Sequence, residues 1–325
     1  MPLLKRLAIC FLFLSITFLF FLTSASPAKA SRIEKLKELK NFGDFDLGPT
    51  FFYIEAKPGE TITRELQVTN RSGKIDSYAV VSEDYEGSND ASQAKVLLGN
   101  RASLFGAKDW MSYEIDKFTL EHADRLFFNV IIKVPADATP GDHYAVALVY
   151  PVRPQTVKQE NAPNVQLTSR VGSSFVIRVA GDFAESGGLT SFSSDKKVYY
   201  DPLVNMKTIF KNVGTVMLQP AGKIIIKDMF GRTTETLEIK PFKVYRESIR
   251  ENINQWNYQF AIGKYTADLE LDRGYGSQLD RATISFWIIP WKLLLIILGT
   301  LIVLISLIIY IKKRFHIHIG VKGKF

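Results

Sequence analysis

The sequence has few of the residues that covalent cross-linking and nucleophilic catalysis use. It contains one cysteine, Cys10, and four histidines among 325 residues. A single cysteine cannot form an intramolecular disulfide, so an exported domain of this chain must be held by its hydrophobic core alone. The low histidine count leaves few candidates for the general base that nucleophilic hydrolysis needs.

Both ends of the chain lack acidic residues. Residues 1–30 contain three basic residues and residues 292–325 contain six, with no Asp or Glu in either segment. The rest of the chain has 32 basic and 33 acidic residues, so the formal net charge of +8 belongs to the ends. A nearly neutral middle excludes the broad basic surface that binds nucleic acid through counterion release.

The N-terminal 30 residues have the pattern of a secretory signal. Lys5 and Arg6 precede the apolar run of residues 7–22, and a small-x-small pattern ends at Ala30. We predict that residues 1–30 are a signal peptide and that the mature chain begins at Ser31. Because the apolar run is long for a signal, an uncleaved membrane anchor is the alternative.

A second apolar run lies near the C-terminus. Leu293–Ile311 is uncharged, and about 1.5 Å of rise per residue gives it a length of roughly 28 Å, close to the thickness of the bilayer hydrocarbon. Trp287 and Trp291 precede the run as an aromatic belt does, and Lys312–Arg314 follows it as expected for a cytoplasmic end. We predict a transmembrane helix with its interfacial flank over residues 286–311 and a basic cytoplasmic tail over 312–325. Residues 31–285 are then outside the cell membrane.

Most of the middle alternates apolar and polar residues with a period of two, which is typical of half-buried strands. Turn residues such as Pro58-Gly59 and Pro140-Gly141 separate the alternating runs. The pattern pauses over Gly181–Gly188 and then resumes. The apolar members of four such runs are Ile62, Leu66 and Val68; Phe128, Val130, Ile132 and Val134; Tyr144, Val146, Leu148 and Tyr150; and Phe175, Ile177 and Val179.

These runs predict an all-β protein of two tandem immunoglobulin-like β-sandwiches, followed by one C-terminal transmembrane helix. The first sandwich is predicted over residues 45–181 and the second over residues 182–285. Residues 31–44 are predicted to be a short helical spacer, because Ile33, Leu36 and Leu39 are three apart.

The order of several short motifs resembles the WxL-interacting proteins of bacterial cell surfaces. For the first domain, the motifs are Lys57–Glu60, Val68–Asn70, Trp110 and Ile132–Tyr144; for the second domain and anchor, they are Lys211–Gly214, Gln219–Ile224, Asp228, Phe230-Gly231 and Phe286–Trp291. The resemblance implies tandem sandwiches, a C-terminal anchor, and contact with peptidoglycan or a partner surface protein. It supplies no catalytic residue, and the segment Glu86–Lys108 does not align with it.

No set of residues predicts catalysis, a cofactor or a metal centre. His122 and His143 are in turn-like contexts, which favours surface or capping roles. Ser173 and Ser174 lack the strand-to-helix context of a nucleophile elbow and are predicted to be strand residues. His316 and His318 belong to the basic tail. We therefore predict that the protein is not an enzyme and binds no cofactor.

Two features of the first domain allow more than one interpretation. Glu83, Asp84, Glu86, Asn89 and Asp90 form an acidic cluster whose spacing matches no EF-hand, so a solvated loop is predicted and Ca²⁺ binding is the alternative. Trp110 is predicted to fill the core, with a ligand-anchoring role as its alternative.

The segment Glu86–Lys108 is longer than a hairpin needs and contains the apolar pairs Leu97-Leu98 and Leu104-Phe105. It either covers the open end of the sandwich or takes part in recognition of a cell-wall or protein ligand.

The sequence thus predicts a non-enzymatic, membrane-anchored binding or scaffold protein of the cell surface. Its predicted partners are the membrane, through one span, and a cell-wall polymer or a surface protein. The alternative is an accessory or sensor subunit of an envelope enzyme complex, with Ca²⁺ in the acidic loop 83–90. The sequence contains no signal for a particular oligomeric state.

Overall fold

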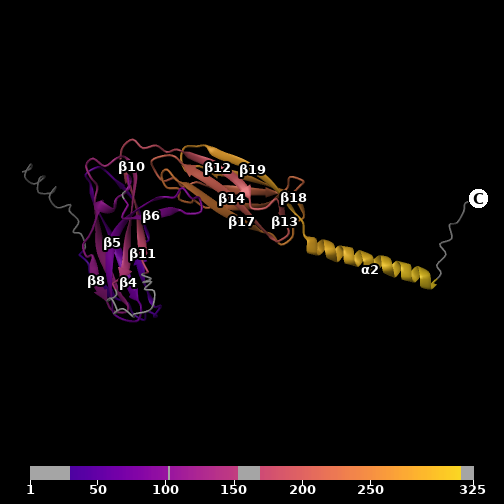
Figure 1. Ribbon diagram of the computed structural model, residues 1–325, viewed down its shortest axis with the longest axis horizontal. Coiled ribbons are helices and arrows are strands. Elements are labelled where there is room, and N and C mark those ends of the chain that lie inside the picture. Colours follow the sequence, from indigo (N-terminus) through magenta and orange to yellow (C-terminus); the bar gives the residue numbers. More distant parts are fainter. Residues whose placement is uncertain (1–29, 102, 153–168, 316–325) are drawn as a thin grey trace, which may run out of the picture. The chain divides into compact units, whose positions relative to one another are not determined.

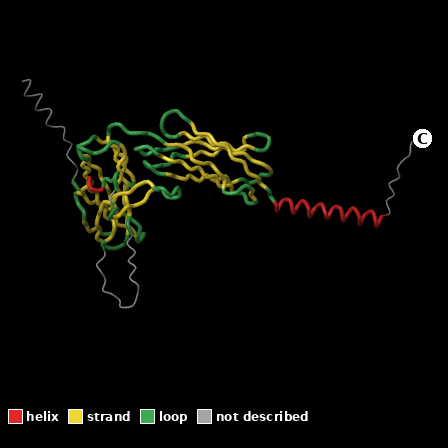
Figure 2. Tube along the Cα trace, turned by 45° about the horizontal axis from the view of Figure 1, so that its top comes forward, coloured by secondary structure: helices red, strands yellow, loops and turns green. Residues whose placement is uncertain are grey.

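Alternation of apolar and polar residues produces strands along most of the chain in the computed structural model (Figure 1). The structure describes residues 30–101, 103–152 and 169–315. These residues are mostly strands, with one apolar helix at the C-terminal side, α2 (Trp291–Phe315), drawn in red in Figure 2. The mostly-β prediction with a C-terminal apolar helix is therefore confirmed. The predicted signal peptide, His316 and His318 lie outside the described residues.

The chain divides into two compact units. The first unit contains the described residues up to Asp84 together with Leu98–Thr139 and His143–Ala180; the second contains Tyr85–Leu97, Pro140–Asp142 and the described residues from Gly181 onward. Two short stretches inside the range predicted for the first sandwich therefore belong to the second unit. The predicted domain bounds of 45–181 and 182–285 stay predictions.

Eleven strands begin in the first part of the chain and form two sheets. The strands are β1 (Arg32–Lys35), β2 (Asp44–Gly48), β3 (Phe51–Ala56), β4 (Thr61–Arg71), β5 (Asp76–Gly87), β6 (Lys95–Gly99), β7 (Met111–Tyr113), β8 (Lys117–Leu120), β9 (Asp124–Lys133), β10 (Gly141–Pro151) and β11 (Val171–Val179). One sheet has the order β1-β9-β4-β2, with β7 also on β9; the other has the order β3-β11-β10-β5-β6, with β8 also on β5. A 3₁₀ turn, η1 (Lys108–Trp110), precedes β7.

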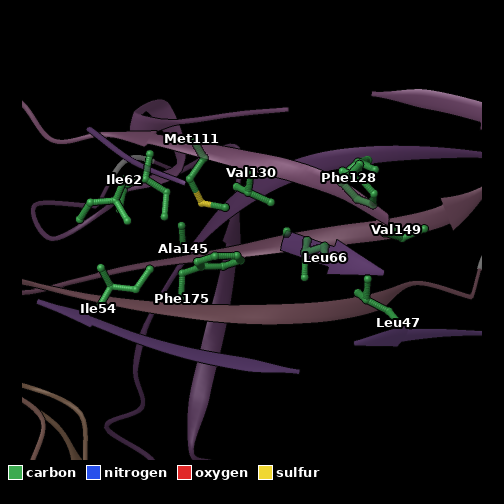
Figure 3. Close-up of a cluster of buried hydrophobic side chains, with 14 of the residues drawn as sticks. Leu47, Ile54, Ile62, Leu66, Met111, Phe128, Val130, Ala145, Val149 and Phe175 are labelled. Atoms are coloured by element: carbon green, nitrogen blue, oxygen red, sulfur yellow. The ribbon is translucent and has the colours of Figure 1, made fainter. Parts of the chain in front are cut away.

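The hydrophobic core of the first unit lies between these two sheets, as Figure 3 shows for Val130, Ala145 and Phe175. The period-two sets predicted for β4, β9 and β11 all face this core and are buried. In β10 the core-facing residues are Ala145, Ala147 and Val149 instead of the predicted Tyr144, Val146 and Leu148. The strand is buried on both faces from Gly141 to Val149, so the alternation there does not mark the core side.

The predicted helical spacer over residues 31–44 is wrong. Arg32–Lys35 forms β1, which pairs antiparallel with β9, and Ile33 of the predicted apolar stripe is exposed. The edge of β9 offers hydrogen bonds to this segment, whereas a helix of so few residues has no tertiary contact to offset its nucleation cost. The backbone N–H of Ser31 extends the attachment, because it donates to Glu114 Oε1 at 3.0 Å.

The second unit also has two sheets around one core. Its strands are β12 (Gly187–Ser194), β13 (Val198–Tyr199), β14 (Leu203–Asn212), β15 (Ala221–Lys227), β16 (Thr233–Ile239), β17 (Ile249–Asn257), β18 (Gly263–Asp272) and β19 (Leu279–Ile288). The sheet orders are β12-β14-β17 and β13-β19-β18-β15-β16. Val204, Ile224 and Phe286 are among the residues buried between them.

The helix α2 follows β19 after two residues, Ile289 and Pro290. Residues Trp291–Arg314 are long and apolar enough to cross a membrane, and none of this stretch is buried in the protein. The helix begins later than the predicted range of 286–311, because residues 286–288 complete β19, and it extends to Phe315.

Replacement of Phe128 by Ala tests the core of the first unit. Phe128 is fully buried, so we expect Phe128→Ala to lower the free energy of unfolding by about 3–5 kcal/mol. The exposed Ile75 gives a matched control, since Ile75→Ala is expected to change it by less than about 0.5 kcal/mol. Urea denaturation followed by tryptophan fluorescence measures both, and equal effects would contradict the described core.

Candidate binding site

The site is built around the point where β5 stops pairing with β10. The last pair in that ladder is Asp84 with Ala145. One residue earlier in β10, Tyr144 pairs with the returning chain instead: its N–H donates to the Phe105 carbonyl at 2.8 Å, and its carbonyl accepts from the Ala107 N–H at 3.2 Å. Beyond Asp84, the segment before η1 therefore replaces β5 as the neighbour of β10.

The Asp84 carboxylate holds the segment before η1 in this position beside β10. Its Oδ1 accepts the backbone N–H of Ala107 at 2.9 Å and that of Lys108 at 2.8 Å. Gly106 is required beside it, since a Cβ there would lie 2.4 Å from Asp84 Oδ2. Asp84 is buried, and burial raises its pKa above the ordinary value even though both backbone donors and the Lys108 ammonium act in the opposite direction.

A hollow of about 600 Å³ opens beside this point, within the first unit. Three elements contribute most of its polar wall: β5, the stretch from Gly99 to η1, and β7. The lining residues are Val81, Ser82, Glu83, Gly99, Asn100, Lys108, Asp109, Met111, Tyr113, Tyr150 and Arg170. The hollow thus combines hydroxyl, carboxamide, carboxylate and cationic groups with two tyrosine rings.

Hydrogen bonds hold the polar groups of the hollow in place. Arg170 Nη1 donates to Glu83 Oε1 at 2.6 Å, and the hydroxyls of Ser82 and Tyr113 are 2.6 Å apart. Burial raises the pKa of Tyr113 to about 12, so its hydroxyl keeps its proton at neutral pH. Such a surface can exchange hydrogen bonds with hydroxyl, amide and carboxylate groups of a polar ligand.

The acidic residues predicted as a possible calcium loop do not converge. Glu83 and Asp84 are neighbours in a strand and therefore point to opposite faces of the sheet. Asp90 instead accepts the N–H and the hydroxyl of Ser92. Among the residues that the structure describes, no group of three His, Cys, Asp or Glu side chains could hold a metal ion. The calcium alternative is therefore not supported by this geometry.

The predicted roles of three aromatic and imidazole side chains have different outcomes. Trp110 is half-buried and packs against the core of the first unit, as predicted. His143 is buried in β10, with its ring 4.5 Å from that of Trp110 and its Nε2 2.9 Å from the Thr139 carbonyl oxygen, so of the predicted surface and capping roles the surface role is wrong. His122 accepts from the Gly73 N–H and contacts the Leu39 carbonyl at 3.0 Å, which is the predicted capping role.

The two serines that the sequence places in a strand do lie in one. Ser173 and Ser174 belong to β11, and the Ser173 hydroxyl donates to the Pro49 carbonyl at 2.7 Å.

The segment Glu86–Lys108 divides between the two units. Its first part belongs to the second unit, where the Ser88 carbonyl accepts from Ile249 N–H at 3.1 Å and the Ala91 carbonyl accepts from Glu251 N–H at 2.8 Å. These bonds attach the loop at residues 88–91 to β17. The last part belongs to the first unit and contributes Gly99, Asn100 and Lys108 to the hollow. Both roles predicted for this segment, the cover of the open end of the sandwich and the recognition of a ligand, stay predictions.

Sequence reasoning missed Tyr113, Tyr150 and Arg170. These residues are far apart in the chain, and only the pairing of β5 with β10 and the path through η1 bring them together. Tyr150 is in a recognised strand run, but nothing in the sequence distinguishes the other two from ordinary surface residues.

No model of a known protein family matches the sequence, and no curated protein matches it. Among solved structures, the chain is similar to the class 5 fimbriae chaperone CfaA, with a TM-score of 0.37 and 12% identity over 74% of this chain and 98% of that chain. It is also similar to the E. coli chaperone DraB, with a TM-score of 0.34 and 13% identity over 74% and 95% of the two chains.

A third similar structure is the CsuC-CsuE chaperone-tip adhesion subunit pre-assembly complex from Csu pili of Acinetobacter baumannii. The TM-score is 0.35 and the identity 11%, over 76% of this chain and 99% of that chain.

Replacement of Asp84 tests whether its carboxylate holds the segment before η1 beside β10. Asp84→Ala removes the acceptor of the Lys108 N–H and the nearer of the two acceptors of the Ala107 N–H, so we expect a loss of about 1–3 kcal/mol in the free energy of unfolding at pH 7. Asp84→Asn keeps one acceptor oxygen and should restore most of that loss. Urea denaturation of the three proteins measures this, and equal losses in both variants would contradict the assigned hydrogen bonds.

The pH dependence of the same variants has a defined sign. Because the folded pKa of Asp84 is raised, its protonated form favours the folded state, and stability falls as pH rises through that pKa. The stability of the wild type relative to Asp84→Asn should therefore decrease between about pH 4 and neutrality. An increase over that interval would show that the carboxylate is stabilised by folding.

Proposed function

We propose that the protein is a non-enzymatic, membrane-anchored binding protein of the bacterial cell surface. It displays two tandem immunoglobulin-like β-sandwiches outside the membrane, and it contacts peptidoglycan or a partner surface protein. The observation that carries this proposal is the direct continuation of a two-sheet β unit into a helix of membrane-spanning length, with only Ile289 and Pro290 between them.

The charges at the two ends of α2 support the orientation. Lys312, Lys313 and Arg314 are in its last turn, and no acidic residue is in its first turn. Basic residues next to a span favour the cytoplasmic side, so the strands that precede the helix face outward. The basic residues that follow are then available to anionic lipids of the inner leaflet.

The hollow of the first unit is the contact site that we propose for the wall polymer. A glycan with peptide side chains carries hydroxyl, amide and carboxylate groups, which match the Tyr113 hydroxyl, the Asn100 carboxamide and the Arg170 guanidinium. The resemblance of the turn motifs to WxL-interacting proteins agrees with this class of ligand. The residues lie on strands or close to them, which keeps their spacing fixed.

Retention on purified cell walls tests the proposed contact. In detergent-solubilised full-length protein, we expect Tyr113→Phe to weaken retention several-fold and Arg170→Ala to weaken it about 10-fold, the loss expected for a hydrogen bond with a charged partner. Arg281→Ala is the control, because Arg281 is an exposed guanidinium in the second unit.

Cosedimentation with wall fragments, with unchanged thermal melting as the check on folding, measures the three variants. Unchanged retention of both hollow variants would exclude the hollow as the wall contact. Capture of a crosslinked surface protein that depends on the same residues would identify a protein as the ligand instead.

Protease protection tests the proposed topology. On intact spheroplasts, external protease should degrade the strand-rich part and leave a fragment of about 30 residues that contains α2 and the basic tail. The N-terminus of the undigested protein should be Ser31. Protection of the region around Trp110 would reverse the orientation, and recovery of Met1 at the N-terminus would favour the uncleaved anchor.

A further inference from the structure

Strand register in the second unit places one group of turns at the end where α2 begins. The first residue of β18, Gly263, pairs with the last residue of β19, Ile288, and Tyr199 of β13 pairs with the same residue. Lys227 at the end of β15 pairs with Thr266 near the start of β18. The turns after β13, β15 and β17 are therefore all beside the exit of the chain toward the helix.

These turns expose large apolar side chains. The side chains in the turns are Tyr200, Met229, Phe230, Phe260 and Ile262, and Trp287 is exposed beside them near the end of β19; the exposed fractions run from 46% for Ile262 to 75% for Phe230. At the opposite end of the same unit, the large apolar residues that are exposed among the described residues are Phe183, Val213 and Leu279, the first residue of β19. The aromatic and long aliphatic groups are thus concentrated at the end next to α2.

The chain holds this end close to the start of the helix. Trp287 N–H donates to the Lys197 carbonyl and Ile289 N–H donates to the Tyr199 carbonyl, both at 2.9 Å, so the exit point is fixed beside β13. Two residues then lead to Trp291, a separation of at most about 11 Å between the Cα atoms of residues 288 and 291. A helix that spans the bilayer brings these turns to the headgroup layer.

The charges at this end fit an anionic lipid surface. Lys196, Lys197 and Lys264 are exposed there, and Asp201 in the turn after β13 is the exposed acidic residue beside them. Two nearby carboxylates are engaged within their own turns: Asp228 with Arg232, and Asp195 with Tyr199 and Asn205. Aromatic and aliphatic groups that enter the headgroup layer, flanked by lysines, are the composition of an interfacial membrane contact.

We propose that this end of the second unit is a membrane-docking surface, formed by the turns after β13, β15 and β17, that binds the outer leaflet of the bilayer crossed by α2. The inference rests on the proposed function, because it requires that α2 spans the membrane. The docked surface holds the second sandwich against the lipid and does not leave it free on the helix.

Depth measurement with spin labels tests this proposal on the full-length chain in a Cys10→Ser background. Single-cysteine variants Gln259→Cys, Ser277→Cys and Leu301→Cys place the label beside Phe260, in the turn at the opposite end, and within α2. The protein is reconstituted into vesicles of phosphatidylglycerol and phosphatidylcholine. Oxygen and a water-soluble nickel chelate then report the lipid and water exposure of each label.

We expect the oxygen-to-nickel accessibility ratio at residue 259 to exceed that at residue 277 at least threefold. The added changes Phe230→Ser and Phe260→Ser should reduce that difference. Equal ratios at 259 and 277 with a lipid-exposed label at 301 would overturn the docking surface and leave the anchor intact. A water-exposed label at residue 301 would overturn the anchor and the docking surface together.

Discussion

The acceptance of two backbone N–H groups by the buried Asp84 carboxylate governs the layout of the first unit. At this residue the pairing of β5 with β10 ends, and Ala107 and Lys108 return to the position beside it. Without this carboxylate the Lys108 N–H would lose its acceptor and the Ala107 N–H would keep only the Tyr144 carbonyl, and an unpaired buried N–H costs more than an ordinary hydrogen bond contributes. The two hydrogen bonds thus connect β5 to the start of the η1 turn, where the 86–108 segment ends.

The segment of residues 86–108, which ends at the Asp84 contact, has one part in each unit. Residues that precede Leu98 are bound to β17 in the second unit, and residues that follow it line the hollow of the first. Here its two parts are constrained by different sheets, and the constraint explains why a segment of this length keeps a defined backbone path.

Sequence patterns predicted those features that depend on local composition. The alternation in β4, β9 and β11 identified the core-facing residues, since each of these strands has one buried face over most of its length. The apolar run of α2 needed only its length and its lack of charge. The pattern failed at β10, where it predicted Tyr144, Val146 and Leu148 as core-facing residues, whereas Ala145, Ala147 and Val149 face the core and both faces of the strand are buried. It also failed at β1, which forms a strand because it pairs with β9, about 90 residues away in the chain.

The hollow could not be predicted, because its residues meet only through long-range pairing. Tyr113 and Ser82 share a hydrogen bond across 31 positions, and Arg170 reaches Glu83 across 87. The acidic cluster was a candidate calcium loop in the sequence because its members are close together in the chain. Consecutive residues of a strand, however, have side chains on opposite faces of the sheet.

The pairing of β3 with β11 also sets the order in which the first unit can fold. β3 occupies residues 51–56, and its partner in the sheet is the parallel strand β11, residues 171–179. During synthesis from the N-terminus, β3 must wait for more than a hundred further residues before that edge can close, and the closure of so long a loop is slow. Until then β3, which contains Phe52 and Ile54, lacks its partner strand. The nascent chain is therefore most prone to aggregation just before β11 is synthesised.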